Sequence, residues 1–100
     1  MAHIFISYIQ ENNLFADRLR IRLVEAGFAV WTGDGLRAGD EWRETVDLAL
    51  REAFAVVVIM SRAASTSPFI AYEWACGLGL GADVIPIVIE PAMLHPRLRA

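Results

Sequence analysis

One carboxylate, Glu73, stands in a helical stretch, SPFIAYEW, that has little structural need of a charge. Phe69, Glu73 and Gly77 recur every four residues and so form one row of that helix. The apolar face at Ile70 and Trp74 is a separate row, which leaves Glu73 able to face a crevice. The common alternative is a solvated glutamate, because glutamate favours helices and is usually exposed. A carboxylate with aromatic walls suits a ligand that has a planar ring and a positive centre.

Hydroxyl and aromatic side chains follow the first two predicted strands. Ser7 and Tyr8 end the strand at 3–8, and Trp31 lies near the end of the strand at 28–32, shortly before Asp34. In an open parallel sheet, ligands bind beyond the carboxyl ends of the strands. We therefore expect Tyr8 and Trp31 to face the same crevice as Glu73.

The sequence matches the motifs for other kinds of chemistry poorly. The segment GDGLRAG follows the second strand with the wrong glycine spacing for a dinucleotide fingerprint. Cys76 has no histidine nearby in sequence and is expected to be a buried thiol, and Ser7 and Ser61 lack a nucleophile elbow. These strand-end serines are more typical of hydrogen-bonding residues. A phosphoryl-accepting domain needs an aspartate where the third strand has Ser61. Two histidines and one cysteine give no metal-ligand spacing.

The elements that would hold these residues alternate along the chain. Strands are predicted at 3–8, 28–32, 55–60 and 83–90, and helices at 12–26, 42–53 and from Ser67 to near Gly81. Strands separated by helices indicate a parallel sheet with helices on both faces. The glycines after Cys76 are expected to weaken and end the third helix. Pro86 indicates that the fourth strand is an edge or has a bulge.

Each helix carries its own local signals. Asn12 or Asn13 can cap the first helix, Asp40 can cap the second, and Ser67 can cap the third, with Pro68 at its first position. Asp47 and Arg51 have the spacing of an ion pair. The apolar face predicted for the first helix consists of Leu14, Phe15, Leu19, Leu23 and Val24, and that of the third consists of Ile70, Ala71, Trp74, Ala75 and Leu78.

Composition limits the class of protein. The 100 residues, 56% of them hydrophobic, can form one small domain whose apolar surface calls for a covering segment or partner. A net charge of -3 with scattered basic residues predicts no nucleic-acid partner. The N-terminus lacks the features of a signal peptide, and the longest apolar stretch, 74–89, is interrupted by glycines and a proline. We expect a cytoplasmic domain with no membrane span and no bound metal.

Five segments, taken in order, resemble a Toll/interleukin-1 receptor (TIR) domain, most closely the bacterial type. They are HIFISY, with His3 in place of the frequent aspartate, GFAVWTGDGLRAGDEW, AVVVIMS, SPFIAYEW and VIPIVIE. The resemblance implies a flavodoxin-like open parallel sheet with helices on both faces. The family's fifth strand and last helix are missing, so residues 1–100 are expected to be a single, C-terminally incomplete domain of a longer protein.

The resemblance also implies an activity. Several TIR domains hydrolyse or cyclise NAD+, and their catalytic glutamate follows an aromatic residue by four positions, as Glu73 follows Phe69 here. NAD+ would be the substrate, and no cofactor is needed. Trp31 matches an aromatic residue on the nicotinamide side, and Ser7, Tyr8, Asp34 and Phe69 would complete the substrate site. Ile9 departs from the polar or basic residues that the family usually has there.

The resemblance also implies a partner, which the loop after the second strand would contact. Its residues, Gly35, Leu36, Arg37, Ala38, Gly39 and Asp40, match the family's lid and contact for neighbouring TIR domains. Homotypic assembly, a sensor or effector domain on the same or an associated chain, and a role in bacterial antiphage signalling follow as expectations. A merely flexible connection is the alternative for the loop. A TIR scaffold that binds other TIR domains without catalysis is the alternative for the whole domain.

Overall fold

The computed structural model describes residues 2–32 and 42–90, so Asp34 and the predicted assembly loop at 35–40 lie outside the described residues. Strands and helices alternate within these ranges, as the sequence predicts. The elements in chain order are β1 (His3–Ser7), η1 (Gln10–Asn12), α1 (Asn13–Glu25), β2 (Val30–Thr32), α2 (Trp42–Arg51), β3 (Ala53–Met60), η3 (Ala64–Thr66), α3 (Pro68–Gly79) and β4 (Asp83–Val88).

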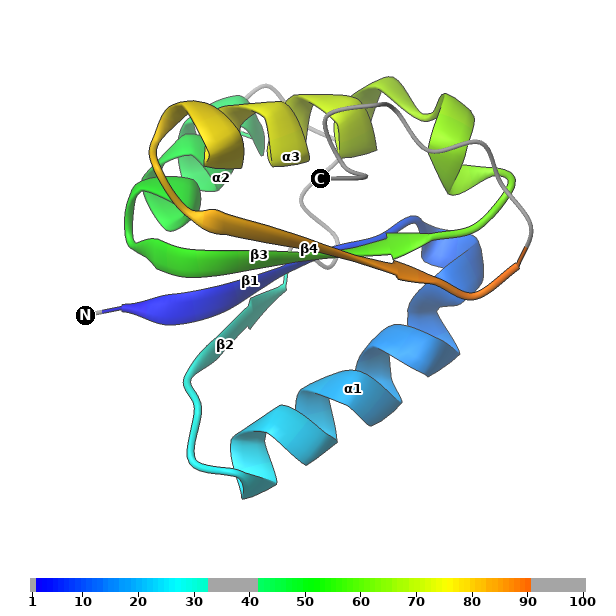
Figure 1. Cartoon of the computed structure of the whole chain (residues 1–100), viewed down its shortest axis with the longest axis horizontal. Coiled ribbons are helices and arrows are strands. Elements are labelled where there is room, and N and C mark those ends of the chain that lie inside the picture. The colour runs from blue at the N-terminus through cyan, green and yellow to red at the C-terminus, as the bar shows by residue number, and fades with distance from the viewer. Residues whose placement is uncertain (1, 33–41, 91–100) are drawn as a thin grey trace.

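The described strands form one parallel sheet in the order β2-β1-β3-β4. Helix α1 lies on one face of the sheet, and α2 and α3 cover the other face (Figure 1). This arrangement confirms the predicted flavodoxin-like open sheet. Strand β4 pairs with β3, and no second partner strand is found in the described part of the chain, as Pro86 indicates.

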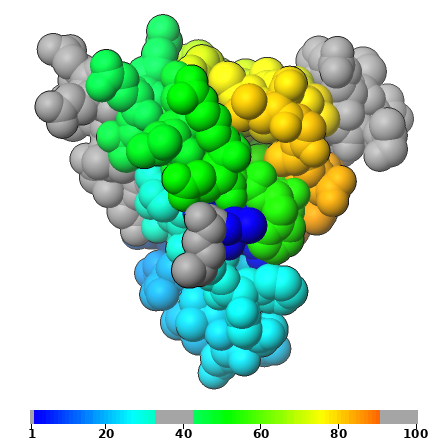
Figure 2. Space-filling view, turned by 90° about the vertical axis from the view of Figure 1, so that its left-hand side faces the viewer, coloured from blue at the N-terminus to red at the C-terminus, as the bar shows by residue number. Residues whose placement is uncertain are grey.

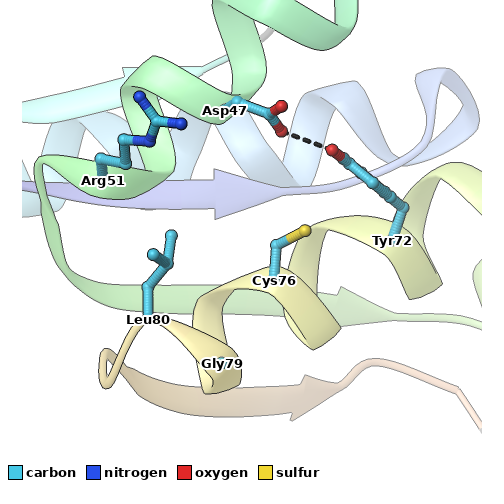
Figure 3. A pocket seen from close by; sticks show the side chains of 6 residues that line it. All are labelled: Asp47, Arg51, Tyr72, Cys76, Gly79 and Leu80. Atoms are coloured by element: carbon cyan, nitrogen blue, oxygen red, sulfur yellow. Dashed lines mark hydrogen bonds between the residues drawn. The ribbon is translucent and has the colours of Figure 1, made fainter.

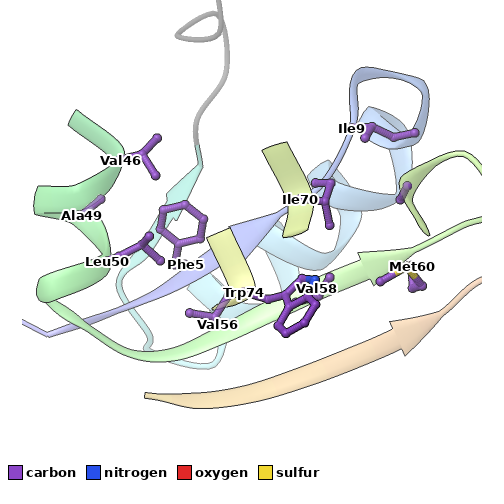
Figure 4. Close-up of a cluster of buried hydrophobic side chains, with 11 residues drawn as sticks. Phe5, Ile9, Val46, Ala49, Leu50, Val56, Val58, Met60, Ile70 and Trp74 are labelled. Atoms are coloured by element: carbon purple, nitrogen blue, oxygen red, sulfur yellow. The ribbon is translucent and has the colours of Figure 1, made fainter. Parts of the chain in front are cut away.

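The main core fills the space between the sheet and the layer of α2 and α3 (Figure 4). Every residue of β3 from Ala55 to Met60 is buried, as expected of a parallel strand covered on both faces. Alternate residues of β3 face this core, where they meet two helices. The buried members of the cluster are Phe5, Ile9, Val46, Ala49, Leu50, Val56, Val58, Met60, Ala64, Ile70 and Trp74.

The face of the sheet on the α1 side is covered less completely. Ala16 is the buried residue of α1, and Leu19 and Leu23 pack on the core from partly buried positions. The predicted stripe is therefore wrong at its edges, because Leu14 is 73% and Val24 51% exposed. The small Ala16 side chain lets the helix lie against the sheet, whereas Leu14 and Val24, at the two ends of the predicted stripe, do not reach it. Figure 2 shows the C-terminal part of α1 and the following residues as the narrow lower end of the molecule, below α2 and α3.

Two helix ends confirm their sequence signals and one does not. Gly27 has a φ of 96°, which favours glycine, directly after α1 ends. The Ser67 hydroxyl accepts a hydrogen bond from the Ile70 N–H at 3.4 Å, so it caps α3 as predicted. Asn12 precedes α1 but makes no side-chain cap hydrogen bond.

The buried face of α3 differs from the predicted one. Ile70 and Trp74 are buried and Leu78 is partly buried, but Ala71 and Ala75 are exposed. Glu73 and Gly77 are buried in their place. A Cβ atom on Gly77 would lie 2.8 Å from Cγ2 of Val56, so glycine allows α3 to lie close against β3. Glu73 and Gly77 therefore face the sheet, whereas Phe69, at the start of the same row, is exposed.

Candidate functional site

The carboxyl end of β1 and helix α3 are joined by a buried hydrogen bond between Ser7 and Glu73. The Ser7 hydroxyl donates to Oε1 of Glu73 at 2.6 Å, across 66 positions of sequence. Both residues are 0% exposed. Burying a carboxylate costs free energy unless hydrogen bonds replace its lost water, and Ser7 provides such a bond. The structure therefore excludes the common alternative, in which Glu73 is a solvated helix glutamate.

Local sequence explains why Glu73 reaches this position. The Ser67 cap and Pro68 at the first helical position set where α3 begins. Glu73 is therefore held about one and a half turns into the helix, above the carboxyl end of β1. Gly77, one turn further on, removes the side chain that would hold the helix away from β3. The sequence thus brings an acidic residue to the same edge of the sheet as Ser7.

Trp31 lies on the same side of the sheet as Ser7. It is opposite Phe5 in the β1–β2 register, and the two rings stack with their centroids 4.8 Å apart and an interplanar angle of 19°. Phe5 and Ser7 are two residues apart on β1, so their side chains leave the same face. The indole is partly buried against the α2–α3 core. An aromatic surface and a carboxylate are therefore found on one face near the strand ends.

Tyr8 takes up a different place from the one predicted, and Phe69 is more exposed than Glu73. Tyr8 is 6% exposed and belongs to the core on the α1 side, together with Ile4 and Ile6. Side chains alternate between the two faces along a strand, so Tyr8 and Ser7 leave opposite faces. Phe69 is 42% exposed, whereas Glu73 on the same row is fully buried. The expectation that Tyr8 faces the same crevice as Glu73 is wrong for this structure.

A second polar link joins the ends of neighbouring strands. The Ser61 hydroxyl, directly after β3, donates to Oδ1 of Asn12 at 2.8 Å and accepts from the Ala64 N–H at 3.1 Å. Its role as a hydrogen-bonding residue is confirmed, and the Asn12 side chain, which makes no cap hydrogen bond, accepts from Ser61. The Arg62 N–H donates to Oε1 of Glu90 at 2.7 Å. Sequence gives no direct signal for these two partners, because each lies far away in the chain.

A groove of about 340 Å³ lies between α2 and α3, on the outer side of the helix layer. Its lining residues are Asp47, Arg51, Tyr72, Cys76, Gly79 and Leu80 (Figure 3). The Tyr72 hydroxyl donates to the Asp47 carboxylate, so the predicted pairing of Asp47 with Arg51 is replaced by a contact between helices. The guanidinium of Arg43 lies 5.1 Å from the centre of the Tyr72 ring. Cys76 is half-buried and not fully buried as expected.

The described residues show neither a metal-binding cluster nor a membrane-spanning helix. Among the described residues, no group of three or more histidine, cysteine, aspartate or glutamate side chains could hold a metal ion. No helix in the described ranges is both long enough and apolar enough to cross a membrane.

The fold and the strand-end residues together define a doubly wound α/β domain with polar and aromatic groups at the carboxyl edge of its sheet. A family model described as "TIR domain" matches residues 4–100, and the chain therefore belongs to the TIR domain family. Comparison with curated proteins gave no match.

Solved structures of TIR domains have the same fold. The TIR domain of the Toll-related receptor TRR-2 from Hydra magnipapillata matches with a TM-score of 0.82 and 20% identity, over 96% of this chain and 77% of that one. The TIR domains of the activated Roq1 resistosome, which recognises the pathogen effector XopQ, match with a TM-score of 0.73 and 22% identity, over 86% of this chain and 56% of that one. A metazoan TIR-STING receptor from C. gigas matches with a TM-score of 0.77 and 20% identity, over 97% of this chain and 35% of that one.

Proposed function

We propose that this TIR domain cleaves the bond between nicotinamide and ribose in NAD+, as a glycohydrolase or cyclase, with Glu73 as its catalytic residue. The observation that carries the proposal is the Glu73 carboxylate held by Ser7 at the carboxyl end of β1. Ligands of open parallel sheets bind at that edge. Membership of the TIR domain family supports the choice of reaction, because several TIR domains consume NAD+.

The chemistry needs one fixed negative charge. As nicotinamide leaves, positive charge spreads over the ribose as an oxocarbenium ion, and a carboxylate held in place stabilises it. Nicotinamide departs neutral, so no second acid is required to protonate it. Trp31, on the same face as Ser7, offers an aromatic surface for the nicotinamide ring.

Complete burial of Glu73 supports the further proposal that activity depends on assembly. A carboxylate with 0% exposure must be uncovered before it can contact a substrate. Association with other TIR domains, through the loop at 35–40, is the proposed cause of that change. The activated Roq1 resistosome is a solved assembly in which TIR domains of this fold occur.

The wider setting is proposed from the family resemblance. We propose a signalling role in bacterial antiphage defence, in the cytoplasm, with a sensor or effector domain on the same or an associated chain. Neither a cofactor nor a nucleic-acid contact is part of the proposal. The product is ADP-ribose or a cyclic form of it.

The test compares Glu73→Gln with the parent chain under conditions that favour assembly. Both proteins are incubated with NAD+ at high protein concentration, and nicotinamide, ADP-ribose and cyclic products are separated by chromatography. We expect the substitution to lower turnover by about 100-fold or more, because the fixed charge is lost while the side-chain shape is kept. Glu25→Gln, at the exposed end of α1, is the matched control and should keep the parent rate.

Complete burial also favours one alternative, a TIR scaffold that binds other TIR domains without catalysis. A carboxylate that only holds α3 to β1 would make the same hydrogen bond to Ser7. The scaffold predicts no loss of NAD+ with the parent chain at any concentration, while the chain still associates in light-scattering measurements. NAD+ turnover that disappears in Glu73→Gln and persists in Glu25→Gln rejects it.

A further inference from the structure

We propose that Ser7 is a positioning residue, which holds the Glu73 carboxylate in its reactive orientation and does not itself bind NAD+. This inference rests on the proposed function and deepens it. It replaces the substrate-binding role that strand position and family resemblance imply for Ser7.

The hydrogen bond to Glu73 uses the donor capacity of Ser7. A serine hydroxyl carries one proton, and the proton of Ser7 is used in the bond to Oε1 of Glu73. The distance of 2.6 Å falls within the range of about 2.5–2.7 Å found for hydroxyl donors to carboxylates. Ser7 therefore has no proton left to donate to a phosphate or a ribose oxygen while it holds Glu73, and its oxygen can only accept.

Strand β1 gives Ser7 a rigid support. Ser7 is the last residue of β1, which pairs with β2 on one side and with β3 on the other. Ser7 itself is opposite Val58 and is 0% exposed. A short side chain on a central strand has little freedom to move. Its hydroxyl is therefore a fixed point against which a longer glutamate side chain can be oriented.

The same edge of the sheet holds a comparable serine, Ser61, with a different partner. Ser61 follows β3, is 1% exposed, and donates to Asn12 and not to a carboxylate. Ser7 and Ser61 are thus two buried strand-end hydroxyls, of which one contacts Glu73. This difference provides an internal control for the loss of a buried hydroxyl at this edge.

Positioning and binding roles separate in steady-state kinetics. Loss of a group that binds the substrate equally in the ground and transition states raises KM and leaves kcat unchanged. Loss of a group that orients the carboxylate lowers kcat, because displacement by about 1 Å can cost on the order of 100-fold. KM then stays near that of the parent.

The experiment measures kcat and KM for NAD+ with the assembled protein carrying Ser7→Ala, Ser7→Thr or Ser61→Ala. We expect Ser7→Ala to lower kcat by about 10- to 100-fold with KM unchanged. Ser7→Thr keeps the hydroxyl and should recover most of the lost rate. Ser61→Ala should keep the parent kcat. If Ser7→Ala does not fold by circular dichroism, Ser7→Cys takes its place, because a thiol is a weaker donor of similar size and should also lower kcat.

The remaining outcomes separate the two proposals. A raised KM with unchanged kcat in Ser7→Ala assigns Ser7 to substrate binding and overturns the inference. Parent kinetics in Ser7→Ala, with Glu73→Gln inactive, also overturn it but leave the proposed function intact. Full activity of Glu73→Gln, or a parent chain with no NAD+ turnover, contradicts the proposed function, and the role of Ser7 falls with it.

Discussion

At the scale of single residues, Tyr72 shows how a contact between helices changes the behaviour of a side chain. Its hydroxyl donates to the Asp47 carboxylate across the groove between α2 and α3. This hydrogen bond, followed by burial and the neighbouring Cys76, raises the pKa of Tyr72 well above its ordinary value of 10.0. Ionisation would remove the proton from that bond and place a phenolate beside a carboxylate.

This shift predicts a loss of stability in alkali. The pKa of Tyr72 is higher in the folded chain than in the unfolded chain, so the stabilisation is complete below pH of about 10 and falls as the pH rises beyond it. We expect the urea midpoint of the parent to drop more steeply than that of Tyr72→Phe as the pH rises above about 10. The chain contains arginine but no lysine, so no amine side chain obscures this range. Equal slopes in the two proteins would contradict the assignment.

The sequence could identify most candidate residues but not their partners. Ser7, Trp31 and Glu73 are recognisable from residue type, strand position and family resemblance. Which of Ser7 and Tyr8 faces Glu73 depends on where α3 crosses the sheet, and neighbouring residues on a strand point to opposite faces. Asp47 likewise has a plausible partner one turn away in Arg51, yet it bonds to Tyr72 on another helix.

At the scale of elements, the close approach of α3 to the sheet depends on one of its two glycines. Gly77 faces β3, where an added Cβ would lie 2.8 Å from Cγ2 of the fully buried Val56. Gly79, two residues later, has no atom within 4 Å of such a Cβ. The sequence predicts that both glycines weaken the helix, and only the packing of α3 on β3 distinguishes them.

Alanine at these two positions should therefore act in opposite directions. Gly77→Ala is expected to lower the free energy of unfolding by about 1–3 kcal/mol, because the methyl group has to displace a packed valine or the helix itself. Gly79→Ala should leave the stability unchanged or raise it by up to about 1 kcal/mol, because alanine favours helix.

Urea denaturation of the parent and the two variants measures both effects. Since Gly77 lies on the same row as Glu73, Gly77→Ala should also lower the proposed NAD+ turnover by moving the carboxylate away from Ser7. A stable Gly77→Ala protein with stability equal to that of Gly79→Ala would show that the contact with Val56 imposes no constraint.

At the scale of the whole molecule, burial differs between the two faces of the sheet. Strand β3 has six consecutive buried residues, and α3 buries Ile70, Glu73, Trp74 and Gly77. Helix α1 buries Ala16. Regions with few buried apolar contacts open more readily than the core that they cover. The alternation of elements could be predicted from the sequence, but this asymmetry could not, because the apolar residues of α1 indicate a fully packed face.

Native-state hydrogen exchange followed by mass spectrometry should reveal this asymmetry. We expect peptides covering α1 to exchange faster than peptides covering α3, a helix of similar length, and those covering β3 to exchange most slowly. Equal protection of α1 and β3 would indicate that the domain opens only as a single unit, and it would contradict the expected order.

At the N-terminal end of β1, a hydrogen bond made by His3 limits which residues of related domains can be substituted into this chain. Nε2 of His3 lies 2.7 Å from the carbonyl oxygen of Ala49, in the last turn of α2, so the ring must act as the donor. The aspartate that is frequent in the family at this position has only acceptors when ionised, and it would face the negative end of a helix. A consensus sequence that places aspartate here would bring two hydrogen-bond acceptors together, the aspartate carboxylate and the carbonyl oxygen of Ala49. His3 and the C-terminal turn of α2 therefore have to be exchanged together when this domain is redesigned or recombined with its relatives.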